Sequence, residues 1–432
     1  MEGLMHYIWE HRLWPAGTLR SVDGLPVAVI DPGRHNGDSG PDFFNAKVRI
    51  GDRMWAGNVE IHVRASDWFR HHHDTDPAYD SVVLHVVDRD DSVVRRRNGE
   101  IIPQLRMPCN PEFSRKYENL TCRADIDLPC ASEIPAMSPL SLTDWLTALA
   151  YERLYDKTDR IDRLLQRFAG DWEQTTYVTI ARALGFGINS EPFERLALAT
   201  PLNFIGKHSD DDLLIEAMLM GQSGLLEVAR CDAYCATLKR EYRFMAAKFG
   251  LKSIDPAAWK MSRMRPANLP YRRIATLAGM LAGGFRMFRR LTECHCADDA
   301  RRLFSPTLNS YWQTHYTLGG AESEPNGAKM SHAMLDVLII NTVSPLLHAY
   351  GIKRGQDELC HRAIDLLCEL PPERNNIVSA FQRAGIRARD AFTTQALIQL
   401  RRAYCEQRKC LFCRIGHRIL SASARRKETN PV

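Results

Sequence analysis

The strongest constraint on the fold is a change in hydrophobic periodicity before residue 141. Up to about residue 108, apolar residues form short runs rich in Val, Ile and aromatic residues, separated by turn residues, which predicts strands. From Ser141 onward, apolar residues recur at helical spacing almost without interruption. We therefore expect an α+β protein: a mixed-sheet α/β module at 1–108, a proline-containing linker at 109–140 and an α-helical domain at 141–432.

The predicted elements of the first module follow a simple order of helix, three strands, short helix, then one or two strands. The opening helix begins at Leu4 and stops before Pro15, and Ser66 is placed to cap the short helix. Gly51-Asp52 predicts a hairpin turn between the second and third strands. The strands are predicted at 26–30, 43–50, 54–63, 81–87 and 100–107, the last an edge strand because of Pro103.

The rest of the chain reads as a series of amphipathic helices. The stretch Met334 to Leu347 is among the most apolar, but Asp336 and Pro345 within it favour a buried core helix over a membrane span. The N-terminus has no secretory signal pattern, so we expect a cytoplasmic protein without membrane association. Helices are predicted at 142–168, 172–185, 191–199, 211–220, 225–248, 270–290, 331–350, 356–369 and 373–404.

A polar constellation lies on two neighbouring predicted strands. Side chains alternate along a strand, so Asn58, Glu60 and His62 share one face, and the hairpin returns the chain so that Glu60 lies beside Asp42. Two carboxylates with a basic group suit Mg²⁺ or Mn²⁺, which lowers the pKa of a bound water. Lys47 falls on the opposite face unless a bulge reverses it. The alternative is structural, with Asp42 capping a turn and Glu60 and His62 forming an internal polar pair.

Other polar residues surround this constellation in the sequence. His35 and Asn36 lie in a loop, and together with Asn58 they are candidates for a second shell that contacts phosphate or holds the ligands. We expect the adjacent histidines of 71–73 to form a solvated turn, because three neighbours rarely face one metal. His85 lies in an apolar strand, where a satisfied core residue is the expected role.

A second candidate metal site lies near the C-terminus. Cys405, Cys410, Cys413 and His417 supply the ligand types and number of a structural zinc site. The thiolates also suit an iron-sulfur cluster, with a fourth cysteine such as Cys360 or Cys368. The alternative is that these residues pack on a helical face. The remaining cysteines of the twelve are expected to be reduced thiols.

Two resemblances extend this interpretation. Pro41-Asp42 followed by Glu60-Ile61-His62, together with the order of elements, resembles the PD-(D/E)xK (restriction-endonuclease-like) nuclease superfamily over about a quarter of the chain. The resemblance implies that Asp42 and Glu60 bind metal, that His62 replaces the usual lysine, and that Glu10 is the first-helix acid of the catalytic set. Imidazole is often neutral near pH 7, so His62 raises the question of whether such a site cleaves.

The longer resemblance is to the bacterial domain-of-unknown-function 2851 family, which implies that module, helical region and cysteine cluster belong to one protein but brings no activity. The segments that carry it are Leu4–Arg12, Ile30–Asn36, Gly40–Lys47, Gly57–His62, Asp76–Val87 and Tyr404–Gly416.

These patterns favour a Mg²⁺- or Mn²⁺-dependent nuclease that hydrolyses phosphodiester bonds of DNA or RNA. The net charge of +5 permits a nucleic-acid partner, bound through a basic surface of the helical region. Two alternatives stand beside it: a catalytically inactive nucleic-acid-binding or scaffold protein, and a metal-assisted hydrolase of a small substrate. The sequence lacks a Walker loop, a complete dinucleotide fingerprint and a His-Glu-x-x-His motif, which argues against those enzyme classes. It carries no signal for oligomeric state.

Overall fold

The computed structural model describes residues 2–14, 17–107, 111–121, 128–262, 264–325 and 329–425. The chain forms two compact units. The N-terminal unit comprises residues 1–139, 383–386 and 401–432, and the helical unit comprises 140–382 and 387–400. The predicted α+β class is confirmed, since a mixed sheet is followed by a mostly helical region.

The N-terminal unit is built on a mixed sheet with the order β1-β3-β4-β5-β6, in which β2 also pairs with β3. The strands β1, β3 and β4 are antiparallel, whereas β5 runs parallel to β4 and β6 runs parallel to β5. The elements are α1 (Glu2–Glu10), β1 (Val27–Asp31), β2 (Arg34–His35), β3 (Phe43–Ile50), β4 (Arg53–Arg64), α2 (Asp67–Arg70), a 3-10 turn (Pro77–Tyr79), β5 (Val82–Arg89) and β6 (Gln104–Arg106).

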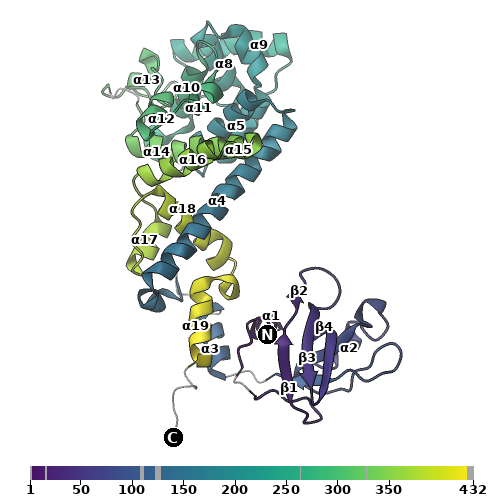
Figure 1. The fold of residues 1–432 in the computed structure, drawn as a ribbon. Helices are drawn as coiled ribbons and strands as arrows, with labels where there is room; N and C mark the ends of the chain where they lie inside the picture. Colours follow the sequence, from purple (N-terminus) through teal and green to yellow (C-terminus); the bar gives the residue numbers. More distant parts are fainter. Residues whose placement is uncertain are drawn as a thin grey trace. The chain divides into compact units, whose positions relative to one another are not determined.

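The two faces of this sheet bury different clusters. Helix α1 packs Leu4, Ile8 and Trp9 with Val59 and Ile61 of β4 on one side. On the other side, where Figure 1 shows α2, a smaller cluster includes residues of α2 and of the 3-10 turn. It consists of Ala65, Trp68, Tyr79, Val82, Val87, Val94 and Ile102. Alternate residues of β4 therefore belong to different environments, as period-two patterning requires.

The predicted strands and the Gly51 hairpin are confirmed, with three local differences. A bulge interrupts the β3–β4 pairing between Phe43 and Ala46, and Asn45 there has a φ of 58°. Ser66 precedes α2 but makes no side-chain cap, because its backbone is already helical with φ of −64° and ψ of −17°. Its hydroxyl donates to Asp91 instead. A short strand, β2, also pairs with the start of β3.

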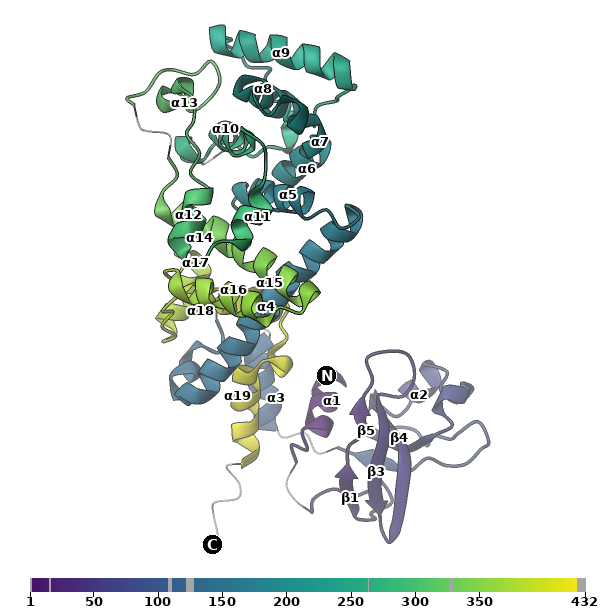
Figure 2. The same cartoon turned by 45° about the horizontal axis from the view of Figure 1, so that its top comes forward.

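The C-terminal segment belongs to the N-terminal unit. Helix α19 lies beside α3 in Figures 1 and 2, and Leu420 of α19 is fully buried in the core that contains α1. The stretch predicted as a linker contributes regular structure to the same unit. The elements are α3 (Pro111–Thr121), a 3-10 turn (Ala131–Ala136), a π-helical turn (Leu400–Cys405), a 3-10 turn (Cys410–Phe412) and α19 (Arg414–Arg425).

The helical unit is a series of packed helices in which α8 and α9 lie side by side (Figure 2). Its longer helices are α4 (Pro139–Arg167), α5 (Trp172–Leu184), α6 (Ser190–Ala199), α8 (Asp212–Gln222), α9 (Ala233–Phe249), α10 (Pro270–Leu281), α14 (His332–Asn341), α15 (Val343–Arg354), α16 (Asp357–Glu369), α17 (Asn376–Arg383) and α18 (Ala391–Gln399). The shorter ones are α7 (Leu202–Ile205), α11 (Met287–Thr292), α12 (Ala297–Leu303) and α13 (Ser310–Thr314), with 3-10 turns at Gly206–His208, Pro256–Ala258 and Pro266–Asn268.

Three helices predicted as continuous are broken in the structure. Gly283 and Gly284 have φ of 71° and 94° and separate α10 from α11, and Gly385, with a φ of 97°, lies between α17 and α18. Thr342 leaves helical geometry between α14 and α15. The apolar residues on both sides of each break have helical spacing. The sequence pattern therefore continues across the break, which only a few backbone angles produce.

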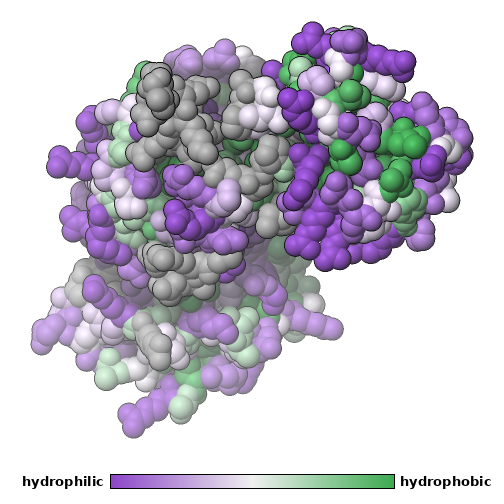
Figure 3. All heavy atoms as spheres, turned by 90° about the horizontal axis from the view of Figure 1, so that it is seen from below, coloured by the Kyte–Doolittle hydropathy of each residue, from purple (hydrophilic) through white to green (hydrophobic). Residues whose placement is uncertain are grey.

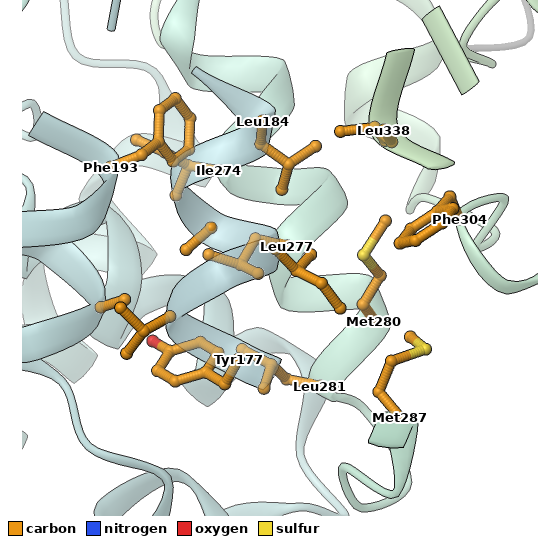
Figure 4. Packing of buried hydrophobic residues seen from close by; sticks show 14 of the residues in the cluster. Tyr177, Leu184, Phe193, Ile274, Leu277, Met280, Leu281, Met287, Phe304 and Leu338 are labelled. Atoms are coloured by element: carbon orange, nitrogen blue, oxygen red, sulfur yellow. The ribbon is translucent and has the colours of Figure 1, made fainter. Parts of the chain in front are cut away.

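The core of the helical unit is apolar and closely packed, as the side chains of Tyr177, Leu277 and Phe304 in Figure 4 illustrate. The stretch His332–Arg354 is long and apolar enough to cross a membrane, but 78% of an apolar 18-residue window within it is buried in the protein, as in a core helix. On the face drawn in Figure 3, hydrophobic side chains form small groups among mostly hydrophilic ones.

Candidate metal centre

Asp42 and Glu60 lie next to each other at one end of the β3–β4 hairpin. Phe43 pairs with Val59, so Asp42 stands just before β3 at the height of Glu60 on β4. The Asp42 amide donates to Glu60 Oε2 at 3.1 Å, and the Ile61 amide donates to Asp42 Oδ2 at 2.8 Å. Both carboxylates are thus held by backbone donors. The structure brings together the two acids that alternation and the hairpin placed on neighbouring strands.

The burial of these two neighbouring carboxylates favours the binding of a cation. Burial raises the pKa of Glu60 to about 9, with a further contribution from the negative charge of Asp42. Only 4% of Glu60 is exposed, so water screens the pair poorly. The raised pKa favours the protonated form of Glu60 when no cation is bound. A divalent ion would displace that proton and satisfy both carboxylates.

Two imidazoles contact the Glu60 carboxylate, and a third contacts one of them. His62 Nε2 and His73 Nε2 lie 3.5 Å and 3.3 Å from Glu60 Oε1, and His62 Nε2 lies 3.1 Å from His71 Nδ1. In the described part of the chain, His62, His71 and His73 alone bring three potential ligand atoms within 4.8 Å of one another. Metal-nitrogen bonds of about 2.0 to 2.1 Å in a tetrahedral site place the ligand atoms about 3.3 Å apart. The donor set fits a metal ion.

The solvated turn predicted for 71–73 is confirmed for His71 and His72, which are exposed, and is wrong for His73, which is buried. The chain turns after α2, where His72 adopts a φ of 62°. His71 is exposed like His72, but its ring and that of His73 flank the ring of His62. His73 is buried and also stacks on Tyr79. A local pattern of three histidines does not reveal which of them point inward, because that depends on how the turn packs against β4.

His85 supports His62 from the neighbouring strand. The parallel register places Glu60 beside His85, and His85 Nε2 shares a hydrogen bond of 2.9 Å with His62 Nδ1. His85 is fully buried. Burial lowers the pKa of His62 to about 3 and that of His85 well below its usual value, and neighbouring imidazoles act in the same direction. Both rings are neutral at pH 7, which is the form that binds a metal or orients a ligand.

The first helix contributes different residues from the one predicted. His6 Nε2 lies 3.3 Å from Asp42 Oδ2, and although burial lowers its pKa, the hydrogen bond and charge of Asp42 raise it overall. Glu2, one turn earlier, acts electrostatically on both His6 and Glu60. Glu10, the predicted first-helix acid, is exposed at the opposite end of α1. The helix directs its N-terminal end toward the carboxylates, and sequence periodicity does not indicate that direction.

The predicted supporting residues have distinct positions. His35 lies at the rim, with its ring 5.7 Å from that of His6. The Asn36 side chain donates to three carbonyls of the loop before Asp42, at Asp38, Ser39 and Pro41. Asn58 accepts from the Asn45 amide in the bulge and donates to Ser81, so it ties β3 to β5. The two asparagines therefore shape the backbone around the carboxylates.

No lysine occupies the position that the nuclease motif assigns to one. The bulge shifts the alternation of β3, but Lys47 pairs with Ala56, four residues along β4 from Glu60, and is exposed. A cation does reach the rim of the cluster: Arg70 Nη2 lies 3.4 Å from His71 Nε2 and 3.1 Å from Asp67.

The C-terminal candidates occupy a turn of the N-terminal unit. Cys405 ends the π-helical turn, Cys410 begins a 3-10 turn, and Cys413 directly precedes α19. A residue that sequence reasoning missed, Cys130, joins them: its thiol pKa is raised to about 12 by burial and by the nearby thiols of Cys413 and Cys410. His417 Nδ1 shares a hydrogen bond of 2.5 Å with the Tyr7 hydroxyl.

A buried cluster of carboxylates and imidazoles on a mixed sheet defines the N-terminal unit as a candidate metal-binding module. The family model described as "Protein of unknown function (DUF2851)" matches residues 2–376, and the chain belongs to this family. The matched range includes the carboxylate and histidine cluster and Cys130, and it ends before Cys405. No curated protein and no solved structure matches the chain.

Proposed function

We propose that this protein is a divalent-metal-dependent nuclease, with its active site at Asp42 and Glu60. The observation that carries the proposal is the convergence of these two carboxylates with His62 and His73 at one end of the β3–β4 hairpin. Nuclease chemistry needs little more than a metal site that polarises a phosphate and activates water. The donor atoms here are numerous and close enough to hold such an ion.

The ligand set favours Mn²⁺ over Mg²⁺. Magnesium demands near-ideal octahedral oxygen coordination and retains several waters, whereas Mn²⁺ shares its preference for carboxylates and has the higher affinity of a transition-metal ion for mixed nitrogen and oxygen sites. His62, His71 and His73 would hold the ion, with Glu60 Oε1 beside His62 and His73. When bound, the metal lowers the pKa of a coordinated water and stabilises charge on the phosphate.

Residues beside the ligands have the chemistry that the reaction needs. His6, paired with Asp42 at 3.3 Å, is placed to accept or return a proton. His62 is buried and neutral, so it cannot supply the permanent positive charge of a lysine. Arg70 at the rim is largely exposed and is free to approach a phosphate oxygen from the solvent side.

A nucleic-acid substrate is supported by the architecture of the unit. The sequence of α1, antiparallel β1, β3 and β4, then α2 and a parallel β5 follows the element order that the resemblance to the PD-(D/E)xK superfamily implies. Pro41-Asp42 directly precedes β3 and Glu60-Ile61-His62 lies within β4, which is compatible with that motif. The net charge of +5 is compatible with a polyanionic substrate.

A second candidate function is hydrolysis of a small phosphate ester. It is favoured by the histidine-rich ligand set, which departs from the lysine-containing motif of the nuclease superfamily. In this case the metal would be the main source of positive charge, and the site would add little to the binding affinity for a polyanion. The two functions share the ligands and differ in the substrate that is turned over.

To test the proposal, the purified full-length protein is incubated with labelled single- and double-stranded DNA and RNA, or with a small aryl phosphodiester. Cleavage is measured in the presence of Mn²⁺, Mg²⁺ or Zn²⁺. We expect Mn²⁺-dependent cleavage of a nucleic acid, reduced at least 100-fold in Asp42→Asn and Glu60→Gln. The control is Asp52→Asn in the exposed turn at the other end of the same hairpin, which should retain full activity.

Each outcome of this assay bears on the proposal. Turnover of the small ester alone would replace the nuclease with the second function. Salt-dependent binding of nucleic acid without cleavage under any metal would indicate a catalytically inactive binding protein. Full cleavage by both carboxylate variants would show that the active site lies elsewhere.

A further inference from the structure

We propose that an exposed face of the sheet beside the metal centre binds the phosphodiester backbone of a nucleic acid. The surface consists of Arg34 on β2 with Lys47 and Arg49 on β3, and is called the cationic strip. The inference rests on the proposed nuclease function for the class of partner. It deepens that function by assigning the surface that holds the substrate away from the metal.

The strip lies on the same face of the sheet as the candidate metal ligands. Val48 and Ile50 of β3 are buried in the core that contains α1. Lys47 and Arg49 alternate with them and are exposed on the other face. Glu60 of β4 lies on that face as well, since both of its neighbours in the strand belong to the same core as α1.

Arg34 extends the strip toward the metal centre. It pairs with Phe44, which directly follows Phe43, and Phe43 is buried in the core with α1. Arg34 therefore lies on the metal side of the sheet, beside the start of β3, and it is exposed. The three cations follow β3 from the end that carries the carboxylates to the hairpin end.

The bulge in β3 directs the later part of the strip toward the metal face. The Asn45 amide donates to Asn58 Oδ1, and the backbone at Asn45 has a φ of 58°. Strict alternation from Phe43 would turn Lys47 toward α1, whereas the extra residue turns it to the other face. Bulges of this kind re-aim side chains next to active sites.

The cations of the strip lack acidic partners. Within the described ranges, Arg34, Lys47 and Arg49 form no ion pair with any carboxylate. Asp31 stands opposite Lys47 in the β1–β3 pairing, but its carboxylate accepts from the Gly33 amide. Three cations beside one carboxylate leave this face positively charged, which is complementary to a polyanion.

The neighbours of the strip leave the cations accessible. Ala56 pairs with Lys47, and Ala28 and Met54 flank Arg49 from the two adjacent strands. Ala56 and Met54 are exposed, so no described element covers this part of the sheet. These apolar neighbours offer no side-chain hydrogen bonds to base edges. Contacts would be made to phosphates, and binding would not depend on base sequence.

The length of the strip fits several nucleotides. Lys47 and Arg49 stand opposite positions four and six residues before Glu60 on β4. At about 3.3 Å per residue, these positions are roughly 13 and 20 Å from Glu60 along the strand. One strand of a duplex rises about 3.4 Å per nucleotide, so phosphates about four and six nucleotides from the cleaved bond would reach the two cations.

Binding is measured on the full-length protein with a chelator present, so that the result does not depend on cleavage. Fluorescence anisotropy follows a labelled duplex of about 20 base pairs, which is longer than the strip. We expect Lys47→Ala combined with Arg49→Ala to weaken binding about 10-fold at low salt. The slope of log affinity against log salt should fall by about 2, one for each lost phosphate contact. Two duplexes of unrelated sequence should bind alike.

Two further variants make the result specific. Lys47→Arg combined with Arg49→Lys keeps both charges and should bind as the natural protein does. Arg243→Ala combined with Lys252→Ala removes two exposed cations of the helical unit and should leave affinity and salt slope unchanged. All of the replaced side chains are exposed, and circular dichroism checks that each variant is folded.

The outcomes separate this inference from the nuclease proposal. Binding that depends on the strip, with no cleavage under any metal, would support the strip and remove the activity. Unchanged affinity and slope in the alanine variant of the strip would overturn the inference. So would absence of binding by the natural protein, a loss confined to the helical-unit variant, or tighter binding to vesicles of anionic phospholipid than to the duplex.

Discussion

At the scale of single residues, the protein concentrates titratable groups where water cannot reach them. Glu60, His62, His73 and His85 are each less than a tenth exposed and contact one another. Burying such groups costs several kcal/mol unless they are paired or bind an ion. The density of imidazoles around one carboxylate is therefore a stronger indication of a metal than either acid alone.

The hydrogen bond from His85 to His62 predicts a measurable effect on metal affinity. His85→Phe keeps the ring volume but removes the group that orients His62, and loss of such a partner typically costs 10- to 100-fold in affinity. Titration of the purified protein with Mn²⁺ by calorimetry should show a loss of that size. His72→Ala, at an exposed histidine of the same region, should bind as tightly as the natural protein. Equal affinity in both variants would contradict the role of His85.

In the helical unit, Glu216 predicts a dependence of stability on pH. Burial raises its pKa to about 7, although Tyr234, Trp312 and Asn309 donate hydrogen bonds that oppose the shift. The folded state then binds this proton more tightly than the unfolded state, whose pKa is near 4.3. The contribution of Glu216 to the free energy of unfolding is therefore fully present below the pKa of the unfolded state. It declines by on the order of 3 kcal/mol as the pH rises toward 7.

Glu216→Gln should remove this decline, since the amide keeps an acceptor for Tyr234 and Trp312 without a charge. Urea unfolding between pH 5 and 8 would show the variant becoming more stable than the natural protein at the upper end. Glu191→Gln, at an exposed position on α6, is the control. An unchanged pH dependence in Glu216→Gln would assign the effect to other groups.

At the scale of elements, the register between β4 and β5 positions the metal centre. That register depends on close approach at Gly57, where a Cβ would lie 2.4 Å from Val83 Cγ1 and 2.7 Å from the Ser81 carbonyl oxygen. Backbone on one side leaves little room for relaxation. The glycine thus allows the two strands that carry Glu60, His62 and His85 to pair.

Gly57→Ala is accordingly expected to destabilise the N-terminal unit by about 1 to 3 kcal/mol through overpacking. Gly3→Ala, on α1 with no atom within 4 Å of the added Cβ, should be neutral or stabilising by up to about 1 kcal/mol because alanine favours helix. Chemical denaturation followed by circular dichroism measures both changes. Equal stability of the two variants would argue against tight β4–β5 packing at Gly57.

At the scale of the whole molecule, the N-terminal unit is discontinuous in sequence. Its sheet is formed by the first 106 residues, yet α19 contributes fully buried Leu420 to the same core. The chain therefore closes this unit only after the helical unit has been synthesised. The C-terminal segment stabilises the sheet as well as carrying Cys405, Cys410 and Cys413.

Leu420→Ala should destabilise the N-terminal unit selectively by about 2 to 5 kcal/mol, the usual cost of a cavity in a core. Hydrogen exchange measured by mass spectrometry should accelerate in β4 and β5 and stay unchanged in α10 of the helical unit. Leu140→Ala, at a leucine that is 80% exposed, should change neither region. Acceleration throughout the chain would mean that the two units unfold together.

The sequence alone determined the features that depend on neighbouring residues. Alternation located the strands and put Glu60 and His62 on one face, turn residues located the Gly51 hairpin that brings Asp42 beside Glu60, and helical spacing identified the second region. These signals are local because side-chain direction repeats every two residues in a strand and every 3.6 in a helix. The breaks at Gly283 and Gly385 lay within such a pattern and were not visible in it.

Only the tertiary structure decided which distant residues complete the two clusters. His6, His73 and His85 reach the carboxylates, and Cys130 reaches Cys410, through the direction of α1, the path of the chain after α2, strand register and the packing of α19. Each of these depends on how apolar faces fit together across long sequence separations. Periodicity shows which face of a helix or strand is buried. Packing decides which other element covers that face, and therefore which polar groups meet at the edge of the contact.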